Sequence, residues 1–387
     1  MKTTLSTLLI LIITVLALAQ KPQKIVSFAI EDHDCDWYTT QTDLWGKEIA
    51  KDSLNADAWM NYYLASRYKV IHCTEKMYYP TPEEMQSLTD ILNEMKNYVP
   101  KSYEYNYLMY YNGGKDPEKN KYLLKAYEID PERTEIYGDL IVYYEINGKY
   151  NDKKLILQKR ENKEPASPGM MAWNYNTLYP LDEKAIILTY GDNDTYQKWT
   201  LQEVYGVRKD VQVINMSLAM IEEYRNRLFE EAGIEPFTMQ VDSTNYMIYS
   251  ALIVEHICKN SGDRPVYISA SMSEDLFKDL KDSLYLEGLV YKYSEERYDN
   301  IAVIKRFYEK EMLKDYIVAP IKFDRSKPIV DRSNLNYIPA FIQLYDHYKL
   351  SGEKGKAEDI GELIIHIARE SGNENYREYV TQYIQGE

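Results

Sequence analysis

A change of hydrophobic period along the chain is the feature that most constrains its fold. From residue 36 to about residue 163, apolar and aromatic residues recur three and four positions apart, as in DWYTTQTDLWGKEI, which is typical of amphipathic helices. Between about 184 and 293 the pattern becomes short β-rich runs separated by helical stretches: KAIILTYG, DVQVINMSL, RPVYISAS and GLVYKY. Strands that alternate with helices predict a mostly parallel sheet covered on both faces. We therefore expect a Rossmann-like, three-layer α/β core flanked by all-α helical hairpins.

The helical regions contain patterns that resemble tetratricopeptide repeats. The segment 119–152 has Ala126-Tyr127, a break at Asp130-Pro131, and a second amphipathic stretch that ends at Asn147-Gly148. This spacing suits a helix-turn-helix unit that stacks on its neighbours. Residues 44–68 resemble a degenerate second copy, and Gly352 to Ala357 resemble the turn of a C-terminal hairpin. The predicted organisation is a helical domain over 20–180, an α/β domain over 181–325 and a helical hairpin region over 326–387.

The first residues indicate export. Lys2 precedes an almost wholly apolar run at 8–18, and Ala-Leu-Ala at 17–19 matches a small-residue cleavage site. This pattern predicts a signal peptide over 1–19, and no later stretch is apolar and long enough to cross a bilayer. We therefore expect a periplasmic or secreted protein with no membrane span after cleavage.

Net charge and cysteine content make some classes of protein improbable for this chain. The net charge of −15 makes nucleic acid and anionic lipid poor partners. Three cysteines are too few for a disulfide-built scaffold, but export permits one bridge, for which Cys35–Cys73 is the candidate. The chain has 39 Tyr against 7 Phe, which suits either sugar- or peptide-binding surfaces or half-buried helices that use Tyr in place of Phe.

The polar stretch GDNDT, residues 191–195, follows an apolar run and precedes a helical pattern. Open parallel sheets place ligand sites at the carboxyl ends of their strands. Asp192, Asn193, Asp194 and Thr195 are therefore candidate ligand-binding residues, for sugar hydroxyls or, through Asp192 and Asp194, for a hard metal cation. In the alternative, Gly191 supplies an unusual backbone angle, Asp194 or Thr195 caps the following helix, and Asp192 and Asn193 close the turn.

A second polar cluster is EDHDCDWY, residues 31–38. Its side chains include metal-ligand types, and His33, Cys35, His72 and Cys73 together form a conceivable zinc set. In the alternative, Asp34 or Asp36 caps a helix whose N-terminus favours acidic residues. No recognised nucleophile, zinc-protease, phosphate-loop or dinucleotide motif is present, and the sequence indicates no cofactor.

Two blocks resemble one known family. ILTYGDNDTYQKWTLQEVYGVRKDVQVINMSL and RPVYISASMSEDLFKDLKDSLYLEGLVYKY are similar to the soluble C-terminal part of bacterial protein O-mannosyltransferase-like membrane proteins, a domain of unknown function. With the closing helices, the resemblance covers roughly 180–370. It implies a shared exported domain and no transferase activity, because that chemistry belongs to a polytopic membrane half that does not precede these residues here.

Two functions from different classes remain open at this stage. The first is a non-enzymatic scaffold or binding protein of the bacterial cell envelope, whose helical repeats bind a protein or peptide partner. The second is a glycan-processing or sugar- or metal-binding accessory protein that uses the GDNDT loop. The missing nucleophile and base favour the first.

Overall fold

The computed structural model describes residues 21–73, 80–113, 116–242, 245, 247–319 and 323–386. The expected signal peptide at 1–19 lies outside these residues. The chain forms two compact units, the first ending at Ile136 and the second beginning at Tyr137. The sequence-based boundaries at 180 and 325 remain predictions. No helix in the described part is both long and apolar enough to cross a membrane.

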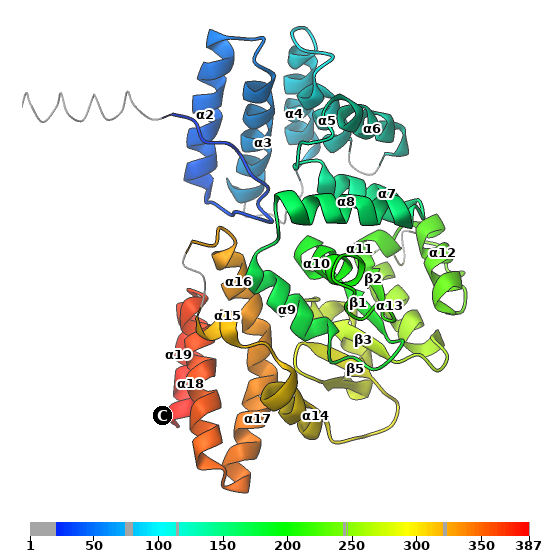
Figure 1. Ribbon diagram of the computed structural model, residues 1–387, viewed down its shortest axis with the longest axis vertical. Coiled ribbons are helices and arrows are strands. Elements are labelled where there is room, and N and C mark those ends of the chain that lie inside the picture. The colour runs from blue at the N-terminus through cyan, green and yellow to red at the C-terminus, as the bar shows by residue number, and fades with distance from the viewer. Residues whose placement is uncertain are drawn as a thin grey trace, which may run out of the picture. The chain divides into compact units, whose positions relative to one another are not determined.

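The first unit consists of helices (Figure 1). They are α2 (Cys35–Lys51), α3 (Ala56–Cys73), α4 (Pro82–Met95), α5 (Tyr103–Tyr111) and α6 (Asn120–Ile129), with the short 3₁₀ helix η1 (Pro117–Lys119) before α6. Local signals set several of the helix ends. Thr81 and Glu84 form a capping box at the start of α4, and the side chain of Asp34 accepts a hydrogen bond from the Trp37 amide at the start of α2.

A disulfide joins the two ends of the α2–α3 hairpin. Cys35 begins α2 and Cys73 ends α3, and their Cα atoms are 4.9 Å apart. The predicted pairing is confirmed, and the conceivable zinc set is wrong because both thiols are used in the bridge. The segment before α2 forms no strand and contains a turn at 28–30. The Ile25 amide donates to Asn61 Oδ1 over 2.7 Å.

Helical hairpins are present, but one is paired differently from the prediction. The break at Asp130-Pro131 does end α6, yet the two units divide between α6 and the next helix. Within its own unit α6 packs on α5. The repeat predicted over 119–152 is therefore not one hairpin within a unit, because the local turn signal gave no information on which helix faces which.

The second unit holds the sheet and the remaining helices. Its helices before and among the strands are α7 (Tyr137–Ile146), α8 (Tyr150–Lys163), α9 (Pro168–Leu178), α10 (Asp192–Glu203), α11 (Met216–Ala219), α12 (Glu222–Ala232) and α13 (Tyr249–Asn260). Its strands are β1 (Ile186–Thr189), β2 (Gln212–Asn215), β3 (Val266–Ser269), β4 (Leu284–Leu286) and β5 (Val290–Tyr293).

The sheet is small and mixed, with strand order β2-β1-β3-β5-β4. β1 pairs in parallel with β2 and β3, whereas β5 is antiparallel to both β3 and β4. A mostly parallel Rossmann-like core is thus not confirmed. The stretch between the third and fourth β-rich runs forms two short 3₁₀ helices, η2 (Glu274–Leu276) and η3 (Lys278–Ser283). A tight turn at Gly288 (φ 75°) then connects β4 to β5. Without a crossover helix, these strands run antiparallel.

The C-terminal part of the second unit is again helical. It comprises α14 (Asn300–Arg306), the π-helix η4 (Phe307–Glu311), α15 (Asp315–Val318), α16 (Lys327–Asn334), the 3₁₀ helix η5 (Leu335–Tyr337), α17 (Ile338–Ser351), α18 (Lys354–Glu370) and α19 (Glu374–Gln385). Helices α17, α18 and α19 lie side by side (Figure 1). The predicted turn at Gly352 is present, in the left-handed conformation at φ 78°.

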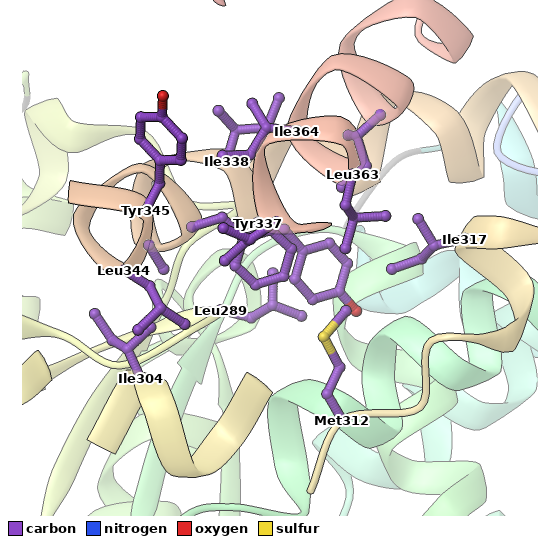
Figure 2. Close-up of a cluster of buried hydrophobic side chains, with 14 of the residues drawn as sticks. Leu289, Ile304, Met312, Ile317, Tyr337, Ile338, Leu344, Tyr345, Leu363 and Ile364 are labelled. Carbon is purple, nitrogen blue, oxygen red and sulfur yellow. The ribbon is translucent and has the colours of Figure 1, made fainter. Parts of the chain in front are cut away.

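These helices close over a large apolar cluster that also includes side chains from the sheet and α9. Figure 2 shows Leu289 and Ile304 beside Tyr337 and Leu344 of η5 and α17. All four side chains are buried. Their burial removes apolar surface from water and fixes the C-terminal helices against the antiparallel edge of the sheet.

Buried tyrosines use their hydroxyls as well as their rings. Tyr63 is fully buried and donates to Asn112 Oδ1 over 2.7 Å in the first unit. In the second unit, Tyr224 is fully buried and donates to Glu145 Oε1 over 2.9 Å. Tyrosine is therefore a packing residue here that also fixes the polar side chain of a neighbouring element.

We expect Cys258 to be unreactive in the folded protein. The thiol is 4% exposed on α13, and burial raises its pKa to about 12, so almost no thiolate is present near neutral pH. Titration with Ellman's reagent should detect no thiol in the native protein, one in denaturant, and all three after reduction. Rapid reaction of native protein would contradict this burial.

Candidate functional site

The GDNDT stretch lies where β1 meets α10. β1 ends at Thr189, Gly191 adopts φ 78°, and α10 begins at Asp192. Gly191 therefore supplies the unusual backbone angle that was expected of it. The sequence pattern placed GDNDT before the helix, but α10 already begins at Asp192, so the polar residues belong to its first turn.

Asp194 points into the protein and joins three elements. It is 4% exposed, and its Oδ2 accepts a hydrogen bond from the Tyr190 amide over 3.0 Å. Its Oδ1 accepts from Lys198 Nζ over 2.6 Å and from Ser269 Oγ over 3.0 Å. The carboxylate thus holds the ends of β1 and β3 against α10.

Lys198 is the partner that the sequence analysis missed. Its side chain is fully buried, and Nζ donates to three acceptors at 2.6–2.8 Å: the carboxylate and backbone carbonyl of Asp194, and Asn174 Oδ1 on α9. It also lies 5.0 Å from the ring centroid of Trp173. Burial lowers the pKa of Lys198, and the Asp194 carboxylate offsets part of that effect. The i, i+4 spacing from Asp194 is the one signal that could have identified it.

Thr195 is fully buried and connects neighbouring strands. Its hydroxyl donates to the Gly191 carbonyl and accepts from Asn215 Nδ2 at the end of β2, both over 2.8 Å. The Thr189 hydroxyl lies 2.9 Å away. The expectation that Asp194 or Thr195 caps the helix is wrong: Gly191 is the N-cap and no side chain caps this end. From the first turn, both side chains face the sheet instead.

Asp192 and Asn193 lie nearer the surface. Asp192 is exposed, and its carboxylate accepts a hydrogen bond from Tyr196 and lies near Arg160. The protein packed around this carboxylate raises its pKa, and Arg160 offsets part of the rise. Asn193 is half-exposed, and its carbonyl accepts from Asn174 Nδ2 over 2.9 Å.

The four candidate residues are thus adjacent in sequence, but Asp194 and Thr195 are buried while Asp192 and Asn193 are exposed or half-exposed. Two are bonded inside the protein, and Asp192 has a cation beside it. Across the described ranges, no group of three His, Cys, Asp or Glu side chains is placed to hold a metal ion. In this geometry Asp194 is a positioning residue for the carboxyl edge of the sheet.

Comparison with known proteins places a recognised domain on these elements. Residues 170–247 match the family described as TMEM260-associated domain 2. The match includes Asn174, Asp194, Lys198 and Asn215, and ends before Ser269. It is consistent with the resemblance to a domain of O-mannosyltransferase-like proteins.

The other comparisons are less informative. No curated protein matches the chain. Among solved structures, the chain is similar to an IFIT1 monomeric mutant with m7Gppp-AAAA, at 13% identity and a TM-score of 0.28, covering 86% of this chain and 68% of that one. The fold and the site together define a helix-rich protein with hairpins and a small mixed sheet.

We expect Asp192→Ala to have little effect on folding. Asp192 is exposed and its partners Tyr196 and Arg160 are half-exposed, so the free energy of unfolding should fall by about 1 kcal/mol or less. The midpoint of urea unfolding measures it. A loss as large as that of a buried ion pair would contradict the assignment of Asp192 to the surface and of Asp194 to the interior.

Proposed function

We propose that this chain is a non-enzymatic scaffold or binding protein of the bacterial cell envelope, whose tetratricopeptide-like hairpins bind a protein or peptide partner. The observation that carries the proposal is that two side chains of the GDNDT loop form hydrogen bonds inside the protein. Asp194 and Thr195 are half of the candidate ligand set. Their side chains form hydrogen bonds with residues in or next to β1, β2, β3 and α10. A catalytic role would need these groups to face a substrate.

The helical hairpins offer surface for a partner. Leu350 at the end of α17 is 90% exposed and Tyr379 on α19 is 55% exposed. Stacked helical hairpins commonly present peptide-binding surfaces, and tyrosine is enriched at interfaces. The C-terminal hairpins are therefore the first surface to test.

Location in an oxidising compartment is part of the proposal. The Cys35–Cys73 disulfide supports it, because such bridges persist mainly in exported proteins. The expected signal peptide agrees with the same location.

The test is direct binding by the mature chain. Proteins captured from envelope extract are purified and their affinity for the chain is measured. Leu350→Glu combined with Tyr379→Glu should weaken a true partner about tenfold or more. Lys354→Glu, at an exposed position on α18, makes the same change in net charge and serves as the matched control. The proposal fails if no purified protein binds, or if the double variant and its control behave alike.

A second candidate function uses Asp192 and Asn193 to bind a glycan or a metal ion as an accessory to glycan processing. Their position at the carboxyl end of β1 favours it, because ligands of open sheets bind there. Calorimetric titration with Ca²⁺, Mg²⁺ and oligosaccharides tests it. Binding that Asp192→Ala abolishes would support this candidate, and an unchanged titration would exclude it.

A further inference from the structure

A pocket of about 230 Å³ lies in the second unit, and none of the four GDNDT side chains lines it. Its position corresponds to the end of β3, the β4–β5 pair, the start of α17 and the start of α19. It is lined by Ala270, Leu286, Tyr291, Leu335, Asn336, Pro339, Asn373 and Tyr376.

The pocket wall is preformed. Leu286 belongs to the apolar cluster of the C-terminal helices, and Tyr291, Leu335 and Tyr376 pack against that cluster. Ala270 is fixed through its amide, which donates to the Leu289 carbonyl over 2.8 Å. The preceding residue, Ser269, is held by Asp194, so the buried network of the first site also positions this wall.

The polar groups of the lining are all uncharged. They are the carboxamides of Asn336 and Asn373 and the phenols of Tyr291 and Tyr376. Asn373 Oδ1 accepts from the Tyr376 amide over 3.0 Å, which orients its NH₂ group as the remaining donor. Neither phenol hydroxyl has a hydrogen-bond partner among the residues that the structure describes. These are groups that a ligand can satisfy.

We propose that this pocket binds a single neutral sugar residue. A sugar ring combines hydroxyls that both donate and accept with an apolar C–H face, and the lining offers amides and phenols beside Leu286, Leu335 and Pro339. A phosphate or carboxylate ligand would need a cation, which the lining does not contain. The volume is below that of a site for a drug-sized molecule, and suits one ring. This inference goes beyond the proposed partner-binding function.

The sugar could be a free monosaccharide or the terminal residue of a glycan. The surface beside the pocket has exposed tyrosines that a longer glycan would contact. Tyr376 is followed along α19 by Tyr379 and Tyr383, with successive ring centroids 6.2 and 6.4 Å apart. Tyr379 and Tyr383 are 55% and 39% exposed. Further sugar residues could contact this row.

The experiment is ligand-detected NMR and calorimetry on the full mature chain. The probes are D-glucose, D-galactose, D-mannose and N-acetyl-D-glucosamine, each also as its methyl glycoside. At least one probe should saturate the wild-type chain. Tyr376→Ala should weaken it about tenfold or more, and Ala270→Leu should abolish it by filling the pocket. Asn336→Asp should also weaken sugar binding. Because this change is nearly isosteric, its effect on binding cannot be attributed to a packing defect.

Tyr316→Ala is the matched control, at an exposed tyrosine of α15 outside the lining and outside the α19 row. It should leave binding of a monosaccharide within about twofold of wild type. Binding of the methyl glycosides would show that the ligand is the terminal residue of a glycan. Binding of the reducing sugars alone would show that the ligand is a free sugar. Both outcomes support the proposal. Three results would overturn the proposal: no probe saturates the chain, Tyr376→Ala and Tyr316→Ala lose binding equally, or only N-acetyl-tyrosinamide, a stand-in for a peptide residue, binds. None of these outcomes tests the proposed binding of a protein or peptide partner, because that experiment uses no sugar.

Discussion

Replacing Lys198 with methionine is expected to lower the free energy of unfolding by about 3–5 kcal/mol. The change leaves the Asp194 carboxylate buried without its cation, and removes the donor to Asn174. A buried charge that loses its partner costs far more than the pair itself contributes. Urea unfolding followed by tryptophan fluorescence measures the loss.

The chain contains a matched control with the same i, i+4 spacing. Glu255 and Lys259 form an exposed ion pair at 2.5 Å on α13, so Lys259→Met should leave the free energy of unfolding almost unchanged. Combining Lys198→Met with Asp194→Asn removes both buried charges and should recover a clear part of the loss. Equal effects of Lys198→Met and Lys259→Met would show that the Asp194–Lys198 pair does not organise this region.

Removing the disulfide is the second large expected effect. Cys35→Ser with Cys73→Ser should destabilise the first unit by about 3–4 kcal/mol, because the bridge closes a loop with a sequence separation of 38 and restricts the unfolded chain. Cys73 is exposed and Cys35 is half-exposed, so neither serine buries an unpaired hydroxyl. Urea unfolding and hydrogen exchange of α2 and α3 measure the effect.

The wild-type chain with a reductant provides the control for this substitution. Reduction should reproduce the loss, and it should add nothing to the double serine variant. If reduced and oxidised wild type unfold at the same urea concentration, the bridge contributes no stability to the hairpin.

Local structure was predictable where local chemistry decides it. The capping box at Thr81 and Glu84, the turn at Gly352 and the backbone angle at Gly191 each depend on residues within a few positions. The apolar runs around Ile187 and Val213 likewise identify strands, because both faces of these strands are buried.

Distant pairings were not predictable from the same patterns. The role of Asp194 depends on Ser269, which is 75 residues away, and on the direction in which its own side chain points from the first turn of α10. The antiparallel edge depends on the turn at Gly288 and on the missing crossover helix. An apolar run shows that a strand is buried and says little about the direction of its neighbour.

The tyrosine-rich interior sets an alkaline limit on the folded state. Burial raises the pKa of Tyr38 and Tyr63 to about 12, above the ordinary value of 10.0 that they regain on unfolding. A raised native pKa means that the stability from these phenols is complete below pH 10 and is lost as the pH rises towards 12. The part of the tyrosinate absorbance that comes from these buried phenols should therefore appear together with the loss of helical circular dichroism. A chain built on phenylalanine would lack this transition.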